Sequence, residues 1–322
     1  MADSSETYSW LLNALTKADN FGAKLSRIES LLSEYFVTRD TRFTGKPAVG
    51  VDLDRTMVYS TASMNLAKLD STTFLRVAEM HEGKPFSYVT SAAYSMLEII
   101  NDNSYLIPVT TRTVEQYRRI RIPGMTETNF LPQTAAQYAV TSNGGKILVN
   151  GLEDKDWSAY MKRLVADNCA PIEQVSDVLN KFDGESWMIK RRAAEGLFTY
   201  LVLDRAETPP GVLESLAEQA KDWNWSVSMQ GRKLYFVPSV MTKGTAYKEI
   251  IIRLGADYCI SAGDSLLDIP LLESADFAIR PAHGELETAG YQAKNLTVTN
   301  NTGILAGEEI VARILARVYS GQ

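Results

Sequence analysis

The sequence predicts an α/β protein, built on a Rossmann-like, doubly wound parallel sheet into which a smaller α+β domain is inserted. Three times along the chain a short apolar run ends abruptly in acidic or hydroxyl residues, at residues 48–56, 105–113 and 258–268. Helical patterns lie between these runs, and this alternation is typical of a parallel sheet with helices on its faces. Between the second and third runs the composition changes, because Trp157, Trp187, Trp223 and Trp225 all lie there.

Length and charge narrow the class of protein. The 322 residues are enough for two domains, and an apolar content of 45% is ordinary for a globular chain. Lys and Arg number 33 against 39 Asp and Glu, so the formal charge is −6, which argues against nucleic acid or anionic membranes as partners. The polar N-terminus resembles no signal peptide, and no apolar run approaches the roughly 18 residues of a membrane span. We therefore expect a cytoplasmic protein.

We expect three parts of the chain to fold as units. Residues 1–45 form an N-terminal helical extension of two helices, residues 46–150 and 232–322 form the core domain, and residues 151–231 form the inserted α+β domain. The two N-terminal helices are expected to pack on the core, and a contact between two copies of the chain is the alternative. The two cysteines, Cys169 and Cys259, belong to no zinc-binding pattern and are expected to be free, buried thiols.

The remaining elements follow from hydrophobic periodicity and from turn residues. In the core we expect a hairpin at Phe74–Pro85, beside the sheet edge where the apolar runs end. Three further strands are expected at Tyr105–Val109, Tyr258–Ala262 and Ala275–Arg280, and a strand pair at Ala139–Val149. Helices are expected at Ser91–Asn101, Val114–Ile120 and Gly307–Tyr319, with another that ends at Leu254. In the inserted domain we expect two helices and four strands: Trp157–Asn168, Pro210–Lys221, Glu185–Arg192, Phe198–Leu203, Ser226–Met229 and Lys233–Val237.

Two aspartates, Asp52 and Asp54, directly follow the first apolar run. Residues two apart in an extended segment point to the same side, so both carboxylates would project into one small volume. A bound cation would offset the repulsion between the two carboxylates. Alternatively, one carboxylate would stay ionised as a nucleophile while the other is held protonated as an acid. A solvated Asp-x-Asp turn is the alternative.

The second and third runs place more polar groups at the same sheet edge. Thr110 follows the second run, and its hydroxyl could bind an anion such as phosphate, although capping of the next helix is the alternative, which Thr113 could supply equally well. Asp264 and Asp268 follow the third run and offer the oxygen ligands that Mg²⁺ prefers. Lys243 stands just before a helix, where the helix dipole does not favour a cation. A negatively charged substrate would explain that lysine, and a solvated surface position is the alternative.

In this order and context, the four motifs resemble those of the haloacid dehalogenase-like (HAD) hydrolases. The resemblance covers residues 45–150 and 232–300. The insertion, Asn143-Gly144 and the residues around Lys243 resemble the branch of Cof-type and sucrose-phosphatase-like enzymes, which carry a large α/β cap domain. The segments DLDRT and PVTTRT also resemble a bacterial HAD subgroup associated with tellurium-resistance gene clusters.

The resemblance implies a role for each motif residue. Asp52 would be the nucleophile and a Mg²⁺ ligand, and Asp54 the general acid/base, with its backbone carbonyl on the metal. Phosphoryl oxygens would be held by Thr110 and Lys243, with Thr111 and Arg112 beside them. Asp264 would complete the metal site, with Asp268 as a ligand or its support, and Arg55 and Asn143 would reach the substrate.

Three residues depart from the family pattern. Arg55 stands where the family usually has Gly, Thr111 where the second motif usually has Gly, and Leu267 where this branch usually has Asn. We expect Arg55 to alter the turn. Leu267 would remove a polar contact near the metal.

The expected function is a Mg²⁺-dependent phosphatase acting on a small phosphorylated metabolite, with sugar phosphates as the leading class. A phosphotransferase or mutase with the same residues is one alternative. A non-catalytic HAD-like protein, whose N-terminal helices bind a partner, is the other.

Overall fold

The centre of the fold is a parallel sheet of five strands in the order β15-β14-β13-β1-β5. The computed structural model describes residues 21–35, 45–65, 68–70, 73–124 and 137–320. β1 lies between two neighbours, with Val51 opposite both Ala262 of β13 and Pro108 of β5. The strand bounds are β1 Ala48–Val51, β5 Tyr105–Pro108, β13 Cys259–Ala262, β14 Phe277–Arg280 and β15 Leu296–Val298. This topology confirms the predicted doubly wound sheet, to which β15 adds an edge strand that was not predicted.

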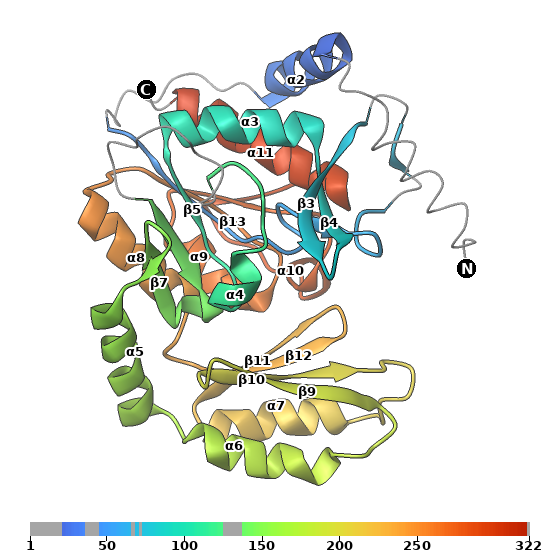
Figure 1. Ribbon diagram of the computed structural model, residues 1–322, viewed down its shortest axis with the longest axis vertical. Coiled ribbons are helices and arrows are strands. Elements are labelled where there is room, and N and C mark those ends of the chain that lie inside the picture. Colours follow the sequence, from blue (N-terminus) through green and yellow to red (C-terminus); the bar gives the residue numbers. More distant parts are fainter. Residues whose placement is uncertain (1–20, 36–44, 66–67, 71–72, 125–136, 321–322) are drawn as a thin grey trace.

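Helices cover both faces of this sheet because β1 is apolar on both sides (Figure 1). Val49 and Val51 pack in the cluster formed with α3 (Ser91–Asn103) and α11 (Ile304–Ser320). On the other face, a Cβ atom at Gly50 would lie 2.7 Å from the ring of Tyr247 in α8 (Lys243–Leu254), so this position needs glycine. The helix can therefore pack directly against the backbone of the strand that ends at Asp52.

The second predicted N-terminal helix, α2 (Phe21–Tyr35), packs on the core as expected. It contacts α11, and Arg27 Nε lies 2.6 Å from Glu308 Oε1. The first predicted helix, around Trp10 and Leu15, lies outside the described residues.

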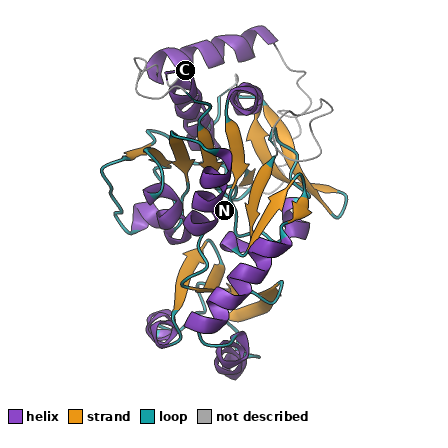
Figure 2. Ribbon diagram, turned by 90° about the vertical axis from the view of Figure 1, so that its left-hand side faces the viewer, coloured by secondary structure: helices purple, strands orange, loops and turns teal. Residues whose placement is uncertain are grey.

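The inserted region forms a separate antiparallel sheet in the order β11-β12-β10-β9. Its strands and helices are β9 Met188–Ala194, β10 Phe198–Leu203, β11 Trp225–Gln230, β12 Lys233–Pro238, α5 Lys155–Asn168, α6 Ile172–Leu179 and α7 Val212–Asp222. Figure 2 shows these strands between the core and the two helices at the bottom of the view, α6 and α7, and α5 runs along the side from the core (Figure 1). We call this sheet the cap sheet.

The expected boundary between residues 231 and 232 is too early. β12 lies inside the cap sheet, paired with both β10 and β11, so the chain returns to the core only after Pro238. Without β12, strand β11 would have no partner in the cap sheet and only the β10–β9 pair would remain. Helix α6, which follows Pro171, was also not predicted.

Two small antiparallel sheets flank the core. The predicted hairpin is present as β3 (Leu75–His81) and β4 (Lys84–Thr90), joined by β2 (Tyr59–Ser60), and His81 is exposed at its turn. β6 (Tyr138–Thr141), β7 (Lys146–Val149) and β8 (Leu152–Glu153) form the other sheet. Short helices are α4 Val114–Tyr117, α9 Ile269–Glu273, α10 Glu285–Thr288, and the 3₁₀ turns η2 Ser142–Gly144, η3 Asn180–Phe182 and η4 Leu266–Asp268. None of the helices in the described ranges has the length and hydrophobicity needed to cross a bilayer.

Candidate active site

The predicted motif residues meet at the carboxyl ends of three neighbouring strands. Asp52 follows β1, Thr110 follows β5 and Asp264 follows β13. Lys243 is the first residue of α8, whereas we expected it just before the helix, so the helix begins one residue earlier than predicted. Thr242 caps this helix by accepting a hydrogen bond from Thr245 N at 3.0 Å. Parallel strands end at one sheet edge, which is why residues more than 200 positions apart come together.

Asp52, Lys243, Asp264 and Asp268 form a buried group, which we call the lysine cluster. Lys243 Nζ lies 2.5 Å from Asp52 Oδ1 and 2.5 Å from Asp268 Oδ1. The lysine is only 1% exposed. The sequence left open whether this lysine is solvated at the surface, and its burial between two carboxylates excludes that alternative.

Asp268 connects Lys243 to the loop that carries Asp264. While its Oδ1 contacts Lys243, its Oδ2 accepts hydrogen bonds from Asp264 N at 3.1 Å, Ser265 N at 2.9 Å and Ser265 Oγ at 2.7 Å. A Cβ atom at Gly263 would lie 2.4 Å from Asp268 Cβ, so the loop can close on Asp268 only with glycine there. Both carboxylate oxygens are therefore occupied, which favours a supporting role for Asp268.

The lysine cluster carries more negative than positive charge. Ligand atoms of Asp52, Asp264 and Asp268 lie within 4.8 Å of one another, and all three residues are buried. Burial is the main reason that the pKa of Asp52 is raised to about 7 and that the pKa of Asp264 lies well above its usual range. A divalent cation would offset this repulsion, and three carboxylate groups are the hard oxygen donors that Mg²⁺ takes. The residues present therefore fit the metal that the HAD resemblance implies.

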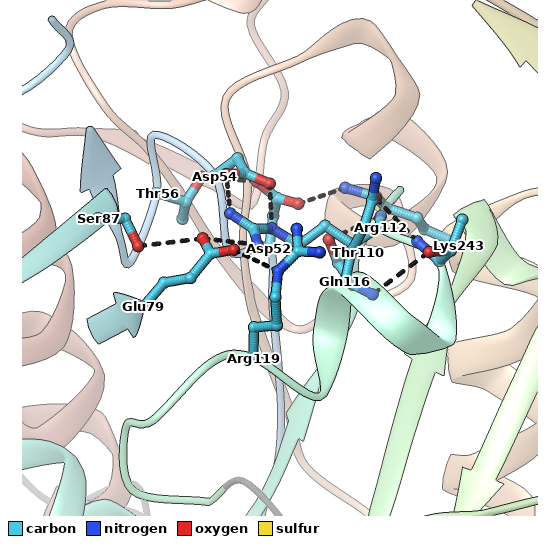
Figure 3. A network of polar contacts seen from close by, with 11 residues as sticks. Asp52, Asp54, Thr56, Glu79, Ser87, Thr110, Arg112, Gln116, Arg119 and Lys243 are labelled. Carbon is cyan, nitrogen blue, oxygen red and sulfur yellow. Dashed lines mark hydrogen bonds and ion pairs between the residues drawn. The ribbon is translucent and has the colours of Figure 1, made fainter. Parts of the chain in front are cut away.

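A second group, the arginine cluster, lies beside the first (Figure 3). Arg112 binds Asp54 with two hydrogen bonds, from Nε to Oδ2 and from Nη2 to Oδ1, both 2.8 Å long. Its Nη1 donates to Glu79 Oε2 at 2.9 Å, and Arg119 Nε donates to Glu79 Oε1 at 2.9 Å. Burial alone would raise the pKa of Asp54, but the Arg112 guanidinium outweighs it and lowers this pKa to about 2. Asp54 is therefore ionised in this arrangement.

Glu79 and Arg119 are site residues that sequence reasoning missed. Glu79 lies on β3 and is fully buried, which is unusual for a carboxylate and indicates a paired role. The only signal in the sequence was an acidic residue inside an alternating strand. Its partner Arg112 is 33 positions away, so no local spacing connects them.

The hydroxyl groups divide between capping and the site. Thr113 forms a capping box with Gln116 at the start of α4, so the capping alternative belongs to Thr113. Thr110 is fully buried, and its Oγ1 accepts a hydrogen bond from Arg112 N at 3.1 Å, which leaves its proton available to an anion. Thr111 is also buried, and it lies near Tyr235 of the cap sheet.

Asn143 points to the segment that links the cap sheet to α8. Its Nδ2 donates to Met241 O at 2.9 Å, while its Oδ1 has no partner among the described residues. It borders a cavity of about 550 Å³ that Trp225 and Leu267 also line.

Arg55 follows Asp54 in the chain and borders the lysine cluster. It has a φ of 64°, in the left-handed region that favours glycine, which explains why the family pattern has Gly here. Its guanidinium lies 3.7 Å from Asp264, and its carbonyl accepts a hydrogen bond from His283 Nε2 at 2.9 Å. Because Gly303 N donates to His283 Nδ1 at 3.2 Å, the ring carries its proton on Nε2. Burial lowers the pKa of His283 to about 4, so this ring is neutral.

Comparison with solved structures finds proteins of similar fold. No protein-family model matches the chain, and no curated protein matches its sequence. The Synechocystis sucrose-phosphatase, solved with sucrose and phosphate, superimposes with a TM-score of 0.55 at 18% identity, over 84% of this chain and 98% of that one. The C-terminal domain of the Candida albicans trehalose-6-phosphate phosphatase gives a TM-score of 0.53 at 10% identity, over 88% and 96%.

These similarities show the fold, an α/β protein with a Rossmann-like core like those of the two phosphatases. Because the identities are so low, they do not transfer an activity to this chain. The subgroup associated with tellurium resistance stays a prediction.

Proposed function

We propose that this chain is a Mg²⁺-dependent phosphatase that hydrolyses a small phosphorylated metabolite through an aspartyl-phosphate intermediate. The observation that supports this most strongly is the lysine cluster, in which Lys243 lies buried between Asp52 and Asp268 beside a third carboxylate, Asp264. Both solved structures described above are phosphatases of phosphorylated sugars by their names, so sugar phosphates are the first class of substrate to test.

Asp52 is the proposed nucleophile. Its carboxylate attacks phosphorus, the bond between phosphorus and the ester oxygen breaks, and the leaving alkoxide takes a proton. Lys243 offsets the repulsion between the attacking carboxylate and the anionic phosphoryl group, which Thr110 helps to hold. Asp52, Asp264 and the backbone carbonyl of Asp54 are the proposed Mg²⁺ ligands, with Asp268 in support. When bound, Mg²⁺ neutralises charge on the phosphoryl oxygens.

Asp54 is the proposed acid/base, and Arg112 controls its protonation. As long as Arg112 grips Asp54, this carboxylate is ionised and can take a proton from water in the hydrolysis of the acyl-phosphate. To act as the acid in the first step, Asp54 must be protonated, which requires that the Arg112 guanidinium move away from it. A phosphoryl group that attracts Arg112 would release Asp54 in this way, so substrate binding itself would raise the pKa of the acid.

The test is phosphate release from a panel of phosphometabolites with and without Mg²⁺, using the full-length chain and Asp52→Asn. We expect Mg²⁺-dependent release, lost on addition of EDTA, and a rate lower by about four orders of magnitude or more in Asp52→Asn, because the nucleophile is removed. Release that is unaffected by Asp52→Asn would contradict the proposal. Phosphate transfer to an added sugar, activated by a bisphosphate, would instead indicate a phosphotransferase.

A further inference from the structure

The face of the cap sheet that is turned to the core carries three cations. Strand pairing aligns residues across all four strands, so that side chains in one row point the same way. One row contains Arg192, Tyr200, Tyr235 and Ser228, and the next contains Lys190, Val202, Lys233 and Gln230.

Contacts on both sides of the sheet identify which face this is. Ser228 Oγ donates to Glu285 Oε2 of the core helix α10 at 2.6 Å, and Tyr235 lies in the same row, where burial raises its pKa and Asp54 at the site raises it further. On the opposite face, Arg191 donates to Ser176 O of α6 at 3.1 Å. The row of Arg192 and Tyr200 therefore faces the catalytic edge, and α6 and α7 cover the other side (Figures 1 and 2).

Lys233 lies close to the reacting centre. The neighbouring Tyr235 and, to a smaller extent, Asp54 raise the pKa of Lys233, and its Nζ is 5.6 Å from the centre of the Tyr200 ring. Lys190 stands two strands away in the same row, which is about 10 Å at the usual strand spacing. The half-buried Tyr200 ring lies beside Tyr235, with 5.2 Å between ring centres.

No ion pair among the described residues neutralises the cations of this face. Lys190, Arg192 and Lys233 are exposed, and none of them forms an ion pair with another described residue. The two rows contain no Asp or Glu, although the chain as a whole has a charge of −6. The phosphoryl group that reacts would already meet Lys243, so three further cations are more than one phosphate monoester needs.

We propose that Lys190, Arg192 and Lys233 form a second anion subsite, and that the substrate is a phosphomonoester whose leaving group carries a further anionic group, a carboxylate or a second phosphate. Tyr200 would lie against the carbon skeleton between the two anions. This inference rests on the proposed phosphatase function for the identity of the first anion, but its test does not depend on turnover.

The test compares the binding of matched probes to the full-length chain bearing Asp52→Asn, in the presence of Mg²⁺, by calorimetry. Glucose 6-phosphate is paired with 6-phosphogluconate, and fructose 6-phosphate with fructose 1,6-bisphosphate. In each pair the second compound adds one anionic group. Affinities are then measured again with Lys190, Arg192 and Lys233 all changed to Gln. Lys181→Gln is the matched control, because Lys181 is an exposed cation of the cap that follows α6 on the other side.

We expect the second compound of at least one pair to bind about tenfold tighter than the first, as for a charge-assisted hydrogen bond, and the triple variant to reduce this ratio to about twofold or less. The pair with the larger ratio identifies the anion as carboxylate or phosphate. Equal affinities within both pairs, no binding of any probe, or a ratio that survives the triple variant would overturn the proposal. If the wild-type chain releases phosphate but the ratio is absent, only the subsite fails. If the ratio is present and no phosphate is ever released, only the phosphatase fails.

Discussion

Asp52 and Asp54 are two residues apart and occupy opposite electrostatic environments. Asp52 is 4% exposed and shares Lys243 with another carboxylate, and its pKa is raised to about 7. The side chain of Asp54 is 43% exposed and accepts two hydrogen bonds from Arg112, whose third nitrogen binds Glu79, and its pKa is lowered to about 2. The lysine ammonium is a compact point charge, whereas the planar arginine guanidinium can donate two parallel hydrogen bonds to one carboxylate, as Arg112 does to Asp54.

The charge balance of the two clusters explains the contrast. In the arginine cluster two cations, Arg112 and Arg119, face two carboxylates, Asp54 and Glu79. In the lysine cluster three carboxylates face Lys243, with Arg55 at 3.7 Å from one of them. The arginine cluster is complete without a ligand, while the lysine cluster has a reason to bind a cation. We therefore expect mutations in the two clusters to differ in how Mg²⁺ affects them.

The largest effect is expected for Lys243→Met. This change leaves Asp52 and Asp268 buried without their cation, which typically costs about 3–5 kcal/mol, and it should lower phosphate release by about a thousandfold or more. Urea unfolding with and without Mg²⁺ measures the first effect, and added Mg²⁺ should restore part of the stability. Lys248→Met is the control, since Lys248 is exposed on the same helix. Equal stabilities of the two variants would show that Lys243 does not balance the cluster.

Glu79→Gln should destabilise the arginine cluster, and added Mg²⁺ should not restore the lost stability. The amide keeps the shape but removes the charge that faces Arg112 and Arg119, so we expect a loss of about 1–3 kcal/mol in the free energy of unfolding. If Glu79 orients Arg112, kcat should fall about tenfold with little change in KM. Glu82→Gln, at the exposed turn of the same hairpin, should change neither quantity. Rescue of Glu79→Gln by Mg²⁺ would remove the distinction between the clusters.

The lysine cluster was predictable and the arginine cluster largely was not, for a physical reason. Asp52, Thr110 and Asp264 each follow an apolar run, and parallel strands bring such positions to one edge whatever their separation in the chain. Glu79 meets Arg112 only because the β3–β4 hairpin folds against this edge, and side-chain contacts of that kind leave no periodic signal. Lys233–Val237 was predicted as a strand of the inserted domain, but the boundary was placed before it, at residue 231, because only the pairing of β12 with β10 and β11 shows where the chain leaves the cap sheet.

His283 supports the turn between the clusters and should make stability depend on pH. Its folded-state pKa of about 4 lies below the usual 6.5, so below pH 6.5 the unfolded chain takes up a proton that the folded chain excludes. Stability should therefore fall as the pH drops from 6.5 to 4, by up to about 1.4 kcal/mol per pH unit from this group. Comparing the free energy of unfolding of the wild type and His283→Gln at pH 7 and pH 5 isolates this contribution. Parallel pH curves would show that the ring titrates normally.

The smallest effects are expected at Arg55, where backbone strain and charge can be separated. Arg55→Gly and Arg55→Ala both remove the guanidinium, but only Gly is comfortable at a φ of 64°, so the Gly variant should be more stable than the Ala variant by about 1 kcal/mol. Both variants should bind Mg²⁺ about threefold tighter than the wild type, because a cation that lies 3.7 Å from Asp264 has gone.

Urea unfolding measures the first difference and calorimetry with Mg²⁺ the second. Equal stability of the Gly and Ala variants would mean that the turn after Asp54 is not strained. An unchanged Mg²⁺ affinity would mean that Arg55 contributes nothing to the charge of the lysine cluster. Lys243 would then be the one cation that balances the three carboxylates of the lysine cluster.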